Sequence, residues 1–209
     1  MENIDCIYYI NLEHRKDRKV EFLNEMKVLE VPESKIVRIE GVYRKDCGAV
    51  GCGYSHIKAL TAFIESGNKN CIIFEDDFKI TLDINYAKYL LRKLFEKNIQ
   101  FDVVMLAGSI HKAESTDILS MYKAHKVLTT SGYIITREFA SVLKDLWLHY
   151  VPLLEEEYKK SGNLLSDYCI DVVWTQIQPQ NRWFIFVPKF GKQRGSYSDV
   201  ENKMIAYSD

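Results

Sequence analysis

Three consecutive acids, Glu75, Asp76 and Asp77, directly follow the apolar run CIIF at positions 71–74. A short run without polar residues is typical of a strand buried on both faces. If strand geometry continues past this run, Glu75 and Asp77 point to one side and Asp76 to the other. Two ionised carboxylates about 4 to 6 Å apart repel by several kcal/mol in a partly buried site, unless one is protonated or a divalent cation binds.

Oxygen-only ligands favour magnesium or manganese over zinc, so the acids at 75–77 predict a site for one of these hard cations. The alternative is structural: three acids can also end a strand in a solvated loop and cap the next element. The position directly behind a buried-type strand favours the metal site.

A basic segment, HRKDRK at 14–19, begins a predicted helix. Its cations oppose the helix dipole, which favours negative charge at this end. An anionic ligand such as a pyrophosphate would turn that conflict into a binding site, because helix amides and arginine forks both suit phosphate oxygens. A solvated basic turn is the equally acceptable structural interpretation.

Ser55 is a plausible N-cap for a helix that stops at Gly67, and the glycines before it predict a flexible, tightly turning connection at 48–53. His56 in the first turn of this helix is more often a polar structural residue than a catalyst. The other histidines, at 14, 111, 125 and 149, show no metal-ligand spacing.

Composition limits the class of protein. The chain has 209 residues, 28 Lys+Arg against 29 Asp+Glu, and 47% hydrophobic residues. This predicts a single domain over residues 1–209 whose core needs no disulfide or structural metal. The charge balance disfavours a nucleic-acid partner. No apolar run approaches a membrane span, and the N-terminal charges follow the apolar stretch, the reverse of a secretory signal, so a cytoplasmic protein is expected.

The five cysteines are an odd number, and the pair at 47 and 52 lacks the spacing of a zinc or redox site. Reduced, mostly packed thiols are therefore expected.

Strand and helix patterns alternate along the chain. Strands are predicted at 6–12, 35–42, 71–74, 103–106, within 127–136, and at 183–187. Helices are predicted after residue 16, from about 55 to 66, and at 84–97, 139–151 and 166–176. The segment 111–126 predicts a mobile loop, Pro152 ends or kinks its helix, and 155–160 is a solvated charge run. This pattern predicts an α/β fold with a mainly parallel central sheet flanked by helices, which binds ligands at the carboxyl ends of its strands.

Six blocks in the same order resemble the family-25 glycosyltransferases, which include bacterial lipooligosaccharide galactosyltransferases and the collagen galactosyltransferase domains of animals and large DNA viruses. The blocks are INLEHRKDR at 10–18, GAVGCGYSHIKAL at 48–60, IIFEDDF at 72–78, FDVVMLAG at 101–108, SGYIITREFASVL at 131–143 and GSYSDVE at 195–201. The resemblance implies a GT-A-like fold in which the acidic motif holds a divalent metal, typically manganese, against the diphosphate of a sugar nucleotide.

Site residues follow from this resemblance. Glu75 and Asp77 match the metal and ribose-side positions of the acidic motif. Where relatives tend to have a His, this chain has residues 190–193, so the third metal ligand is open between Gln193 and Asp199, and Asp199 is assigned to the metal. The substrate-binding positions implied are Asn11, Arg15, Arg18, Ser55, His56, Asp76, Gln193 and Ser198.

The reaction implied is inverting transfer of a hexose, galactose or glucose, from a UDP-sugar to a hydroxyl of a glycan, a lipid-linked glycan or a protein. A metal and arginines stabilise the departing diphosphate, and a carboxylate takes the proton of the acceptor hydroxyl. Asp167 is the expected base, with Asp171 in reserve. The structural alternative for both is surface or N-cap duty on a helix.

Two other functions compete. A metal-dependent phosphohydrolase also uses acids at a strand end, but enzymes with an aspartyl nucleophile usually place them on the first strand, which here ends in Asn11-Leu12. The second is a non-catalytic module that keeps the fold and binds sugar nucleotides or a partner. Turnover separates that module from an enzyme.

Overall fold

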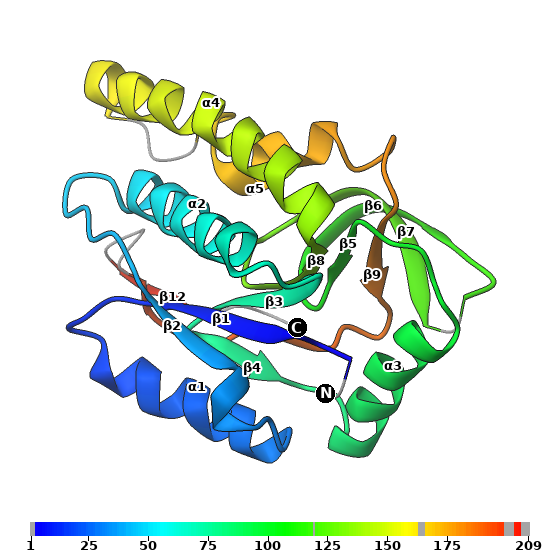
Figure 1. Ribbon diagram of the computed structural model, residues 1–209. Coiled ribbons are helices and arrows are strands. Elements are labelled where there is room, and N and C mark those ends of the chain that lie inside the picture. The colour runs from blue at the N-terminus through cyan, green and yellow to red at the C-terminus, as the bar shows by residue number, and fades with distance from the viewer. Residues whose placement is uncertain (1–2, 119, 163–165, 199–202, 206–209) are drawn as a thin grey trace.

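An eight-stranded sheet forms the middle layer of the protein, seen in a computed structural model that describes residues 3–118, 120–162, 166–198 and 203–205 (Figure 1). Its strand order is β2-β1-β3-β8-β5-β9-β7-β6. The strands are β1 (Cys6–Asn11), β2 (Ile36–Glu40), β3 (Asn70–Glu75), β5 (Val103–Met105), β6 (Ser109–Ser115), β7 (Met121–Leu128), β8 (Gly132–Thr136) and β9 (Trp183–Phe186).

Most strands of this sheet share one direction. β8 is antiparallel to both of its neighbours, β3 and β5, and β7 is antiparallel to both β9 and β6. The remaining pairs, β1 with β2, β1 with β3, and β5 with β9, are parallel. All strands of the sheet except β7 and β8 therefore point the same way, as the alternating pattern predicted.

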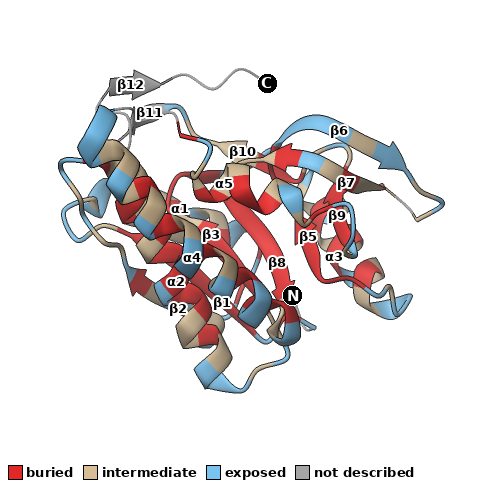
Figure 2. Cartoon of the chain, turned by 90° about the horizontal axis from the view of Figure 1, so that it is seen from above, coloured by how far each residue is buried: buried red, intermediate tan, exposed pale blue. Residues whose placement is uncertain are grey.

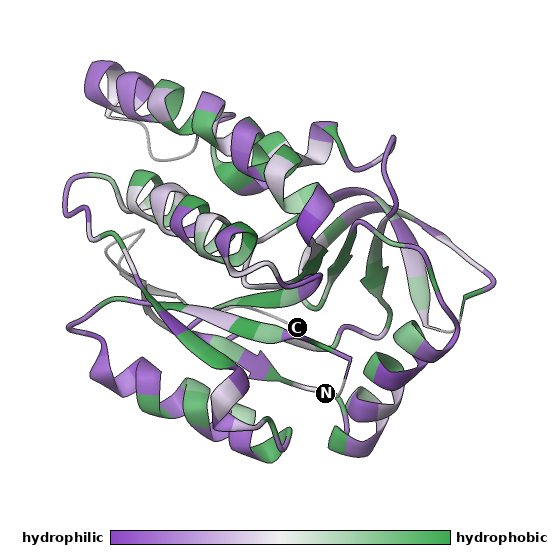
Figure 3. Cartoon of the chain, viewed as in Figure 1, coloured by the Kyte–Doolittle hydropathy of each residue, from purple (hydrophilic) through white to green (hydrophobic). Residues whose placement is uncertain are grey.

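Helices cover both faces (Figure 1). The helices α2 (Gly48–Ser66), α4 (Arg137–Ser161) and the short α5 (Ile170–Val173) lie on one face, and α1 (Lys16–Val28) and α3 (Ile84–Glu96) on the other. Single 3-10 turns occur at Glu33–Lys35 and Trp174–Gln176. Figure 2 shows β8 buried and β6 exposed, and Figure 3 shows hydrophobic residues along the central strands against a largely hydrophilic α1.

The strand before the three acids is buried on both faces, as predicted. Cys71 and Ile73 belong to the apolar cluster under α2 and α4, whereas Ile72 and Phe74 belong to the cluster over α1 and α3. Alternating side chains of one strand thus enter two cores, which excludes water from both sides of β3.

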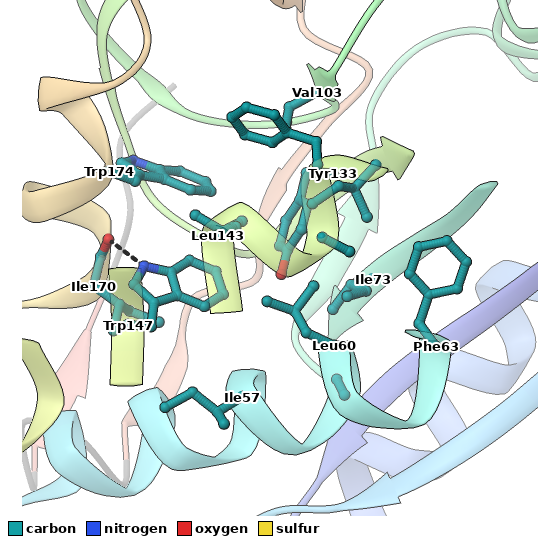
Figure 4. Packing of buried hydrophobic residues seen from close by; sticks show 14 of the residues in the cluster. Ile57, Leu60, Phe63, Ile73, Val103, Tyr133, Leu143, Trp147, Ile170 and Trp174 are labelled. Carbon is teal, nitrogen blue, oxygen red and sulfur yellow. Dashed lines mark hydrogen bonds between the residues drawn. The ribbon is translucent and has the colours of Figure 1, made fainter. Parts of the chain in front are cut away.

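Aromatic side chains fill the core under α4. Figure 4 shows Trp147 and Trp174 beside Tyr133, and the indole Nε1 of Trp147 donates a hydrogen bond to the carbonyl oxygen of Ile170 at 3.1 Å. This bond ties α4 to the start of α5, and it satisfies the polar atom of a buried tryptophan.

The helix that carries His56 begins earlier than expected. α2 starts at Gly48 and includes the segment predicted as a flexible connection. A Cβ at Gly51 would lie 2.4 Å from the carbonyl oxygen of Val42, and one at Gly53 would lie 2.6 Å from a methyl group of Val151. These glycines allow close packing inside a helix, which sequence reasoning interpreted as flexibility.

The predicted mobile loop at 111–126 is also wrong. The segment forms most of the hairpin β6–β7, with six residues of β6 paired to β7. β6 lies at the edge of the sheet with nearly every residue exposed, so it lacks the apolar alternation that marks a half-buried strand. β7 buries Met121, Ala124 and Val127.

Two helix boundaries differ from the prediction. α4 runs through Pro152 to Ser161 and includes the charge run at 155–160. An internal proline costs a helix about 3 kcal/mol, and burial of Val151 and Leu154 on either side offsets that cost. The predicted helix at 166–176 starts later, at Ile170, and is continued by a 3-10 turn.

Two small antiparallel pairs lie outside the large sheet. β4 (Phe78–Ile80), which follows the acids directly, pairs with β10 (Gly191–Gln193), and β11 (Ser196–Ser198) pairs with β12 (Lys203–Ile205). Across the described ranges, no helix combines the length and the apolar character that a membrane crossing needs.

Substitution of Gly51 by Ala tests the packing role of this glycine. Helix propensity alone predicts a gain of roughly 0.5–1 kcal/mol. Because the new Cβ meets backbone, we instead expect Gly51→Ala to lose about 1–3 kcal/mol in urea unfolding. Glu65→Ala, at an exposed position of the same helix, should stay within about 0.5 kcal/mol of wild type. A Gly51→Ala protein as stable as wild type would contradict the assignment.

Candidate functional site

The three acids lie at the carboxyl edge of the parallel strands. β3 ends at Glu75, residues 76–77 form a turn, and β4 then begins. In the parallel neighbour β1, Ile10 pairs with Glu75, so Asn11 lies beside the turn. Because the strand ends at Glu75, the expected alternation does not continue, and contacts decide where each carboxylate points.

Asp76 and Asp77 share one arginine. Arg18 Nη1, from α1, lies 3.1 Å from Asp76 Oδ1 and 3.2 Å from Asp77 Oδ2. Asn11 Nδ2 donates to Asp76 Oδ2 at 2.7 Å, and Arg38 Nε on β2 in turn donates to Asn11 Oδ1 at 3.0 Å. Both carboxylates are almost fully buried, so Arg18 supplies the opposite charge that burial requires.

Glu75 has partners on the other face. Thr130 donates its hydroxyl to Glu75 Oε1 at 2.7 Å, and His56 Nε2 lies 3.4 Å from the same oxygen. The His56 ring is fully buried, with its Nδ1 3.1 Å from the hydroxyl of Tyr133, whereas the Glu75 side chain keeps 20% of its surface exposed. The backbone N–H of Glu75 donates to the carbonyl oxygen of Ser131, in the loop before β8. Glu75 is the acid that faces solvent from a firmly held position.

These environments separate the pKa values of the acids. Burial, followed by the negative charge of Glu75, raises the pKa of Asp77 to about 8. Burial also raises the pKa of Asp76, against the opposing effect of Arg18. Burial opposes ionisation of Glu75, but the hydrogen bond and charge of His56 together with Thr130 bring its pKa below the usual range. Glu75 is ionised, and Asp77 holds a proton near neutral pH until a cation replaces it.

The donor set fits a hard divalent cation. Asp77 Oδ1 is buried and has no hydrogen-bond partner among the residues that the structure describes. Arg18 pairs with Asp76 and Asp77, and Glu75 is ionised on the other side, so a divalent cation that displaces the Asp77 proton would bind two carboxylates. Carboxylate oxygens are the ligands that Mg²⁺ and Mn²⁺ prefer.

A strained loop closes the Glu75 side. Thr129 has φ 84°, a left-handed conformation that a β-branched residue rarely adopts. Its N–H donates to Asp171 Oδ2 at 3.2 Å. The half-buried Asp171 has a pKa raised by burial, and it lies close enough to Glu75 for the negative charge there to raise it further. Such strain persists only where surrounding contacts impose it, which is typical of functional sites.

The C-terminal segment reaches the same turn. Arg194 donates its backbone N–H to the carbonyl oxygen of Asp77 at 2.7 Å. Its side chain binds α1, with Nη2 2.9 Å from Glu25 Oε1 and Nε 3.2 Å from Glu21 Oε2. α1 therefore holds both Arg18 and the strand that flanks the acids. Half-buried Gln193 precedes Arg194 and pairs with Phe78 in the β10–β4 ladder.

The structure brings together many of the sequence-predicted site residues. Asn11, Arg18, His56 and Asp76 all contact one another or the acids at 75 and 77. The sequence could not show that they contact in two separate groups, Asp76 and Asp77 on Arg18, and Glu75 on His56.

Two other predicted residues make no side-chain contact with the acids that is recorded among the described residues. Arg15 accepts a hydrogen bond from Asn11 Nδ2 through its carbonyl oxygen at 2.9 Å, and its Nη2 pairs with the exposed Asp17 at 2.9 Å. Ser55 is no N-cap: its hydroxyl donates to the carbonyl oxygen of Gly51 and accepts from the N–H of Val42. Both contacts are structural.

The two candidate bases separate. Asp167 is exposed in a turn, whereas Asp171 lies in the first turn of α5 beside the strained loop. The structure therefore brings Asp171, rather than Asp167, toward Glu75. Ser198 ends the strand β11, and Asp199 lies outside the described residues.

Sequence reasoning missed Thr130, Tyr133 and Cys52. Thr130 and Tyr133 flank Gly132 in a segment interpreted only as strand, and no local signal shows that it returns beside β3. Cys52 has a signal: it precedes His56 by four residues, which puts both side chains on one face of a helix.

Comparison with known proteins supports the fold. No protein-family model and no curated protein matches the sequence. A solved structure described as mannose-1-phosphate geranyltransferase from Thermus thermophilus is similar at TM-score 0.51 and 9% identity, over 92% of this chain and 74% of that one. A glycosyltransferase involved in glycosylation of the major capsid of PBCV-1 is similar at TM-score 0.50 and 11% identity, over 94% and 96%. These similarities confirm the predicted GT-A-like α/β fold.

The shared arginine should contribute strongly to stability. Arg18→Met keeps the aliphatic stem but leaves two buried carboxyl groups without a cation, so we expect a loss of about 3 kcal/mol in urea unfolding. The matched variant Arg92→Met breaks a surface pair with Glu96, in which the two side chains are 60% and 41% exposed, and should lose less than about 1 kcal/mol. Equal losses would show that Arg18 does not neutralise the buried acids.

Proposed function

We propose that this protein is a metal-dependent inverting glycosyltransferase that transfers a hexose, galactose or glucose, from a UDP-sugar to a hydroxyl acceptor. The observation that carries the proposal is Asp77, a buried carboxyl group with one unpartnered oxygen among the described residues, beside Glu75 at the carboxyl edge of β3. The six family-25 blocks support the reaction type, and the fold similarity to two transferases is consistent with it.

Glu75 and Asp77 would hold the cation, Mn²⁺ or Mg²⁺, with Asp199 proposed as a third ligand. When bound, the cation stabilises negative charge that develops on the diphosphate leaving group. Arg18 and Asn11 hold Asp76 and Asp77 in place. Because these side chains are already held in position, the site needs little reorganisation when the UDP-sugar binds.

Substrate-binding duties remain proposals for the residues around this centre. Arg15 and Arg18 lie at the N-terminal end of α1, where positive charge and helix amides suit diphosphate oxygens. Asp76 is proposed to bind the nucleoside part of the UDP-sugar. The other proposed substrate-binding residues are Ser55 and His56 on α2 and Gln193 and Ser198 in the C-terminal segment.

Asp171 is proposed as the base. The acceptor oxygen forms a bond to the anomeric carbon while the bond from that carbon to the diphosphate oxygen breaks, and the acceptor proton passes to the Asp171 carboxylate. One displacement inverts the anomeric carbon. Burial raises the pKa of Asp171, which makes the carboxylate a stronger base than one in water.

The acceptor is proposed as a glycan, a lipid-linked glycan or a protein hydroxyl, with no nucleic acid involved. A cytoplasmic location stays a prediction from the sequence. The phosphohydrolase alternative is disfavoured by the placement of the acids on β3, because β1 ends in an amide, Asn11.

UDP release from a panel of UDP-sugars tests the proposal. We expect one donor to be hydrolysed slowly with Mn²⁺ and not with a chelator. Asp77→Asn should lower that rate at least about 100-fold, because a preorganised electrostatic contact is worth this much. Asp145→Asn, at an exposed position of α4, is the matched control and should keep the wild-type rate. Metal-dependent UDP binding without release from any donor would indicate the non-catalytic module instead.

The base assignment is tested once an acceptor is found. Asp171→Asn should lower kcat by about 10²- to 10⁴-fold with little change in the KM of the donor, whereas Asp167→Asn should be close to wild type. The reverse order of the two variants would assign the base to Asp167.

A further inference from the structure

The side chains of Cys52, His56 and Glu75 lie close together at the end of β3, on the side toward α2. The ligand atoms of Cys52, His56 and Glu75 all lie within 4.8 Å of one another. Among the residues that the structure describes, no other group of three His, Cys, Asp or Glu side chains meets this limit, and neither Asp76 nor Asp77 belongs to this group. The cluster is thus distinct from the carboxylates that Arg18 holds.

The secondary structure holds the cluster in place. Cys52 and His56 are separated by about one turn of α2, so both side chains lie on the face of the helix that packs on the sheet. Glu75 approaches from the end of β3. Two ligands from one helix turn and a third from an adjacent strand form a rigid donor set, because neither element is a loop.

The spacing of two of these atoms matches a zinc site. His56 Nε2 and Glu75 Oε1 are 3.4 Å apart, which is long for a hydrogen bond. Zinc binds nitrogen and carboxylate oxygen at about 2.0–2.2 Å in tetrahedral geometry, and those lengths put two such ligands about 3.3–3.5 Å apart. The separation of the two atoms is therefore the one that a tetrahedral zinc ion requires of a nitrogen and an oxygen ligand.

Tyr133 orients the histidine. Its hydroxyl, which points toward α2 in Figure 4, lies 3.1 Å from His56 Nδ1. When zinc binds, it takes the place of the Nε2 proton, which passes to the solvent, and His56 donates its Nδ1–H to this hydroxyl. Metal-bound histidines almost always have such a partner on their second nitrogen, because it sets the tautomer and the ring orientation.

We propose that Cys52, His56 and Glu75 form a binding site for Zn²⁺, with water as the fourth ligand. Sulfur and imidazole ligands select a softer ion than the oxygen set around Asp77. Glu75 would serve both sites, so zinc withdraws it from the hard-cation position and inhibits transfer. This inhibition, unlike zinc binding itself, rests on the proposed function.

The partly exposed Glu75 provides the entry side for the ion. When zinc binds Cys52, the S–H bond gives way to an S–Zn bond and the proton passes to the solvent.

Cobalt is the probe, because Co²⁺ replaces Zn²⁺ and a thiolate–cobalt bond absorbs in the near ultraviolet. The whole protein is titrated with Co²⁺, and Zn²⁺ is then added to displace it. We expect a charge-transfer band in wild type that Zn²⁺ abolishes. Cys52→Ser should lack the band and bind Zn²⁺ at least about tenfold more weakly. Cys169→Ser, which removes another half-buried thiol near Cys52, is the matched control and should keep the band.

Two further variants make the result decisive. His56→Gln should shift the cobalt spectrum and weaken Zn²⁺ binding, whereas Asp77→Asn should keep the band, because it lies outside this cluster. Circular dichroism confirms that each variant is folded. No band in wild type, or an equal band in Cys52→Ser and Cys169→Ser, would overturn the site.

Activity forms a separate readout. Zn²⁺ should inhibit UDP release by wild type and by Cys169→Ser, and should inhibit Cys52→Ser at least about tenfold less. If cobalt binds as expected but no UDP-sugar is turned over, the proposed function fails while the zinc site stands. If turnover is normal and Zn²⁺ inhibits all three proteins equally, the inhibition does not come from this site.

Discussion

Burial of negative charge at the end of β3 is the constraint on which the rest of the site depends. Two carboxyl groups with almost no solvent contact need a cation, and Arg18 reaches both. Much of the surrounding structure positions that arginine or its partners. Asn11 donates to Asp76 and is itself held by Arg38 from β2, and Arg194 ties the C-terminal segment to the same helix that carries Arg18. A divalent ion that displaces the Asp77 proton would bind Asp77 together with the ionised Glu75.

The site has two sides with different chemistry. The side toward α1 is ionic, with Arg18 between Asp76 and Asp77. The side toward α2 is made of neutral donors and a histidine, and it keeps Glu75 ionised while Asp77 retains a proton. This separation gives adjacent carboxylates different roles, which is how sites built from like charges become functional.

Close packing of helices positions the residues on the side of the site toward α2. Gly51 lets α2 approach the chain at Val42, and Gly53 lets α4 approach α2. That approach brings His56 beside Tyr133 and Trp147, and it sets Cys52 close to Glu75. The strained backbone of Thr129 adds a third element, because it places Thr130 on Glu75 and its own N–H on Asp171. Two glycines and the left-handed backbone of Thr129 thus allow side chains from four segments of the chain to lie around Glu75.

The amino-acid sequence alone determined the α/β alternation, the burial of β3 on both faces and the position of the three acids at a strand end. These features follow from local periodicity and from the rule that parallel strands present their carboxyl ends at one edge. The resemblance of its motifs to the family-25 glycosyltransferases, rather than local periodicity, indicated Asn11, Arg18, His56 and Asp76.

Only the tertiary structure decided which carboxylate meets which partner, that Asp171 rather than Asp167 lies near Glu75, and that Thr130 and Tyr133 belong to the site. It also showed that the glycines at 51 and 53 lie inside a packed helix and that β6 is an exposed edge strand paired with β7. The spacing of residues along the chain determines which face of a helix or strand each side chain occupies. The contacts between β3, α2 and β8 depend instead on how these separate elements pack together. No local pattern carries that information.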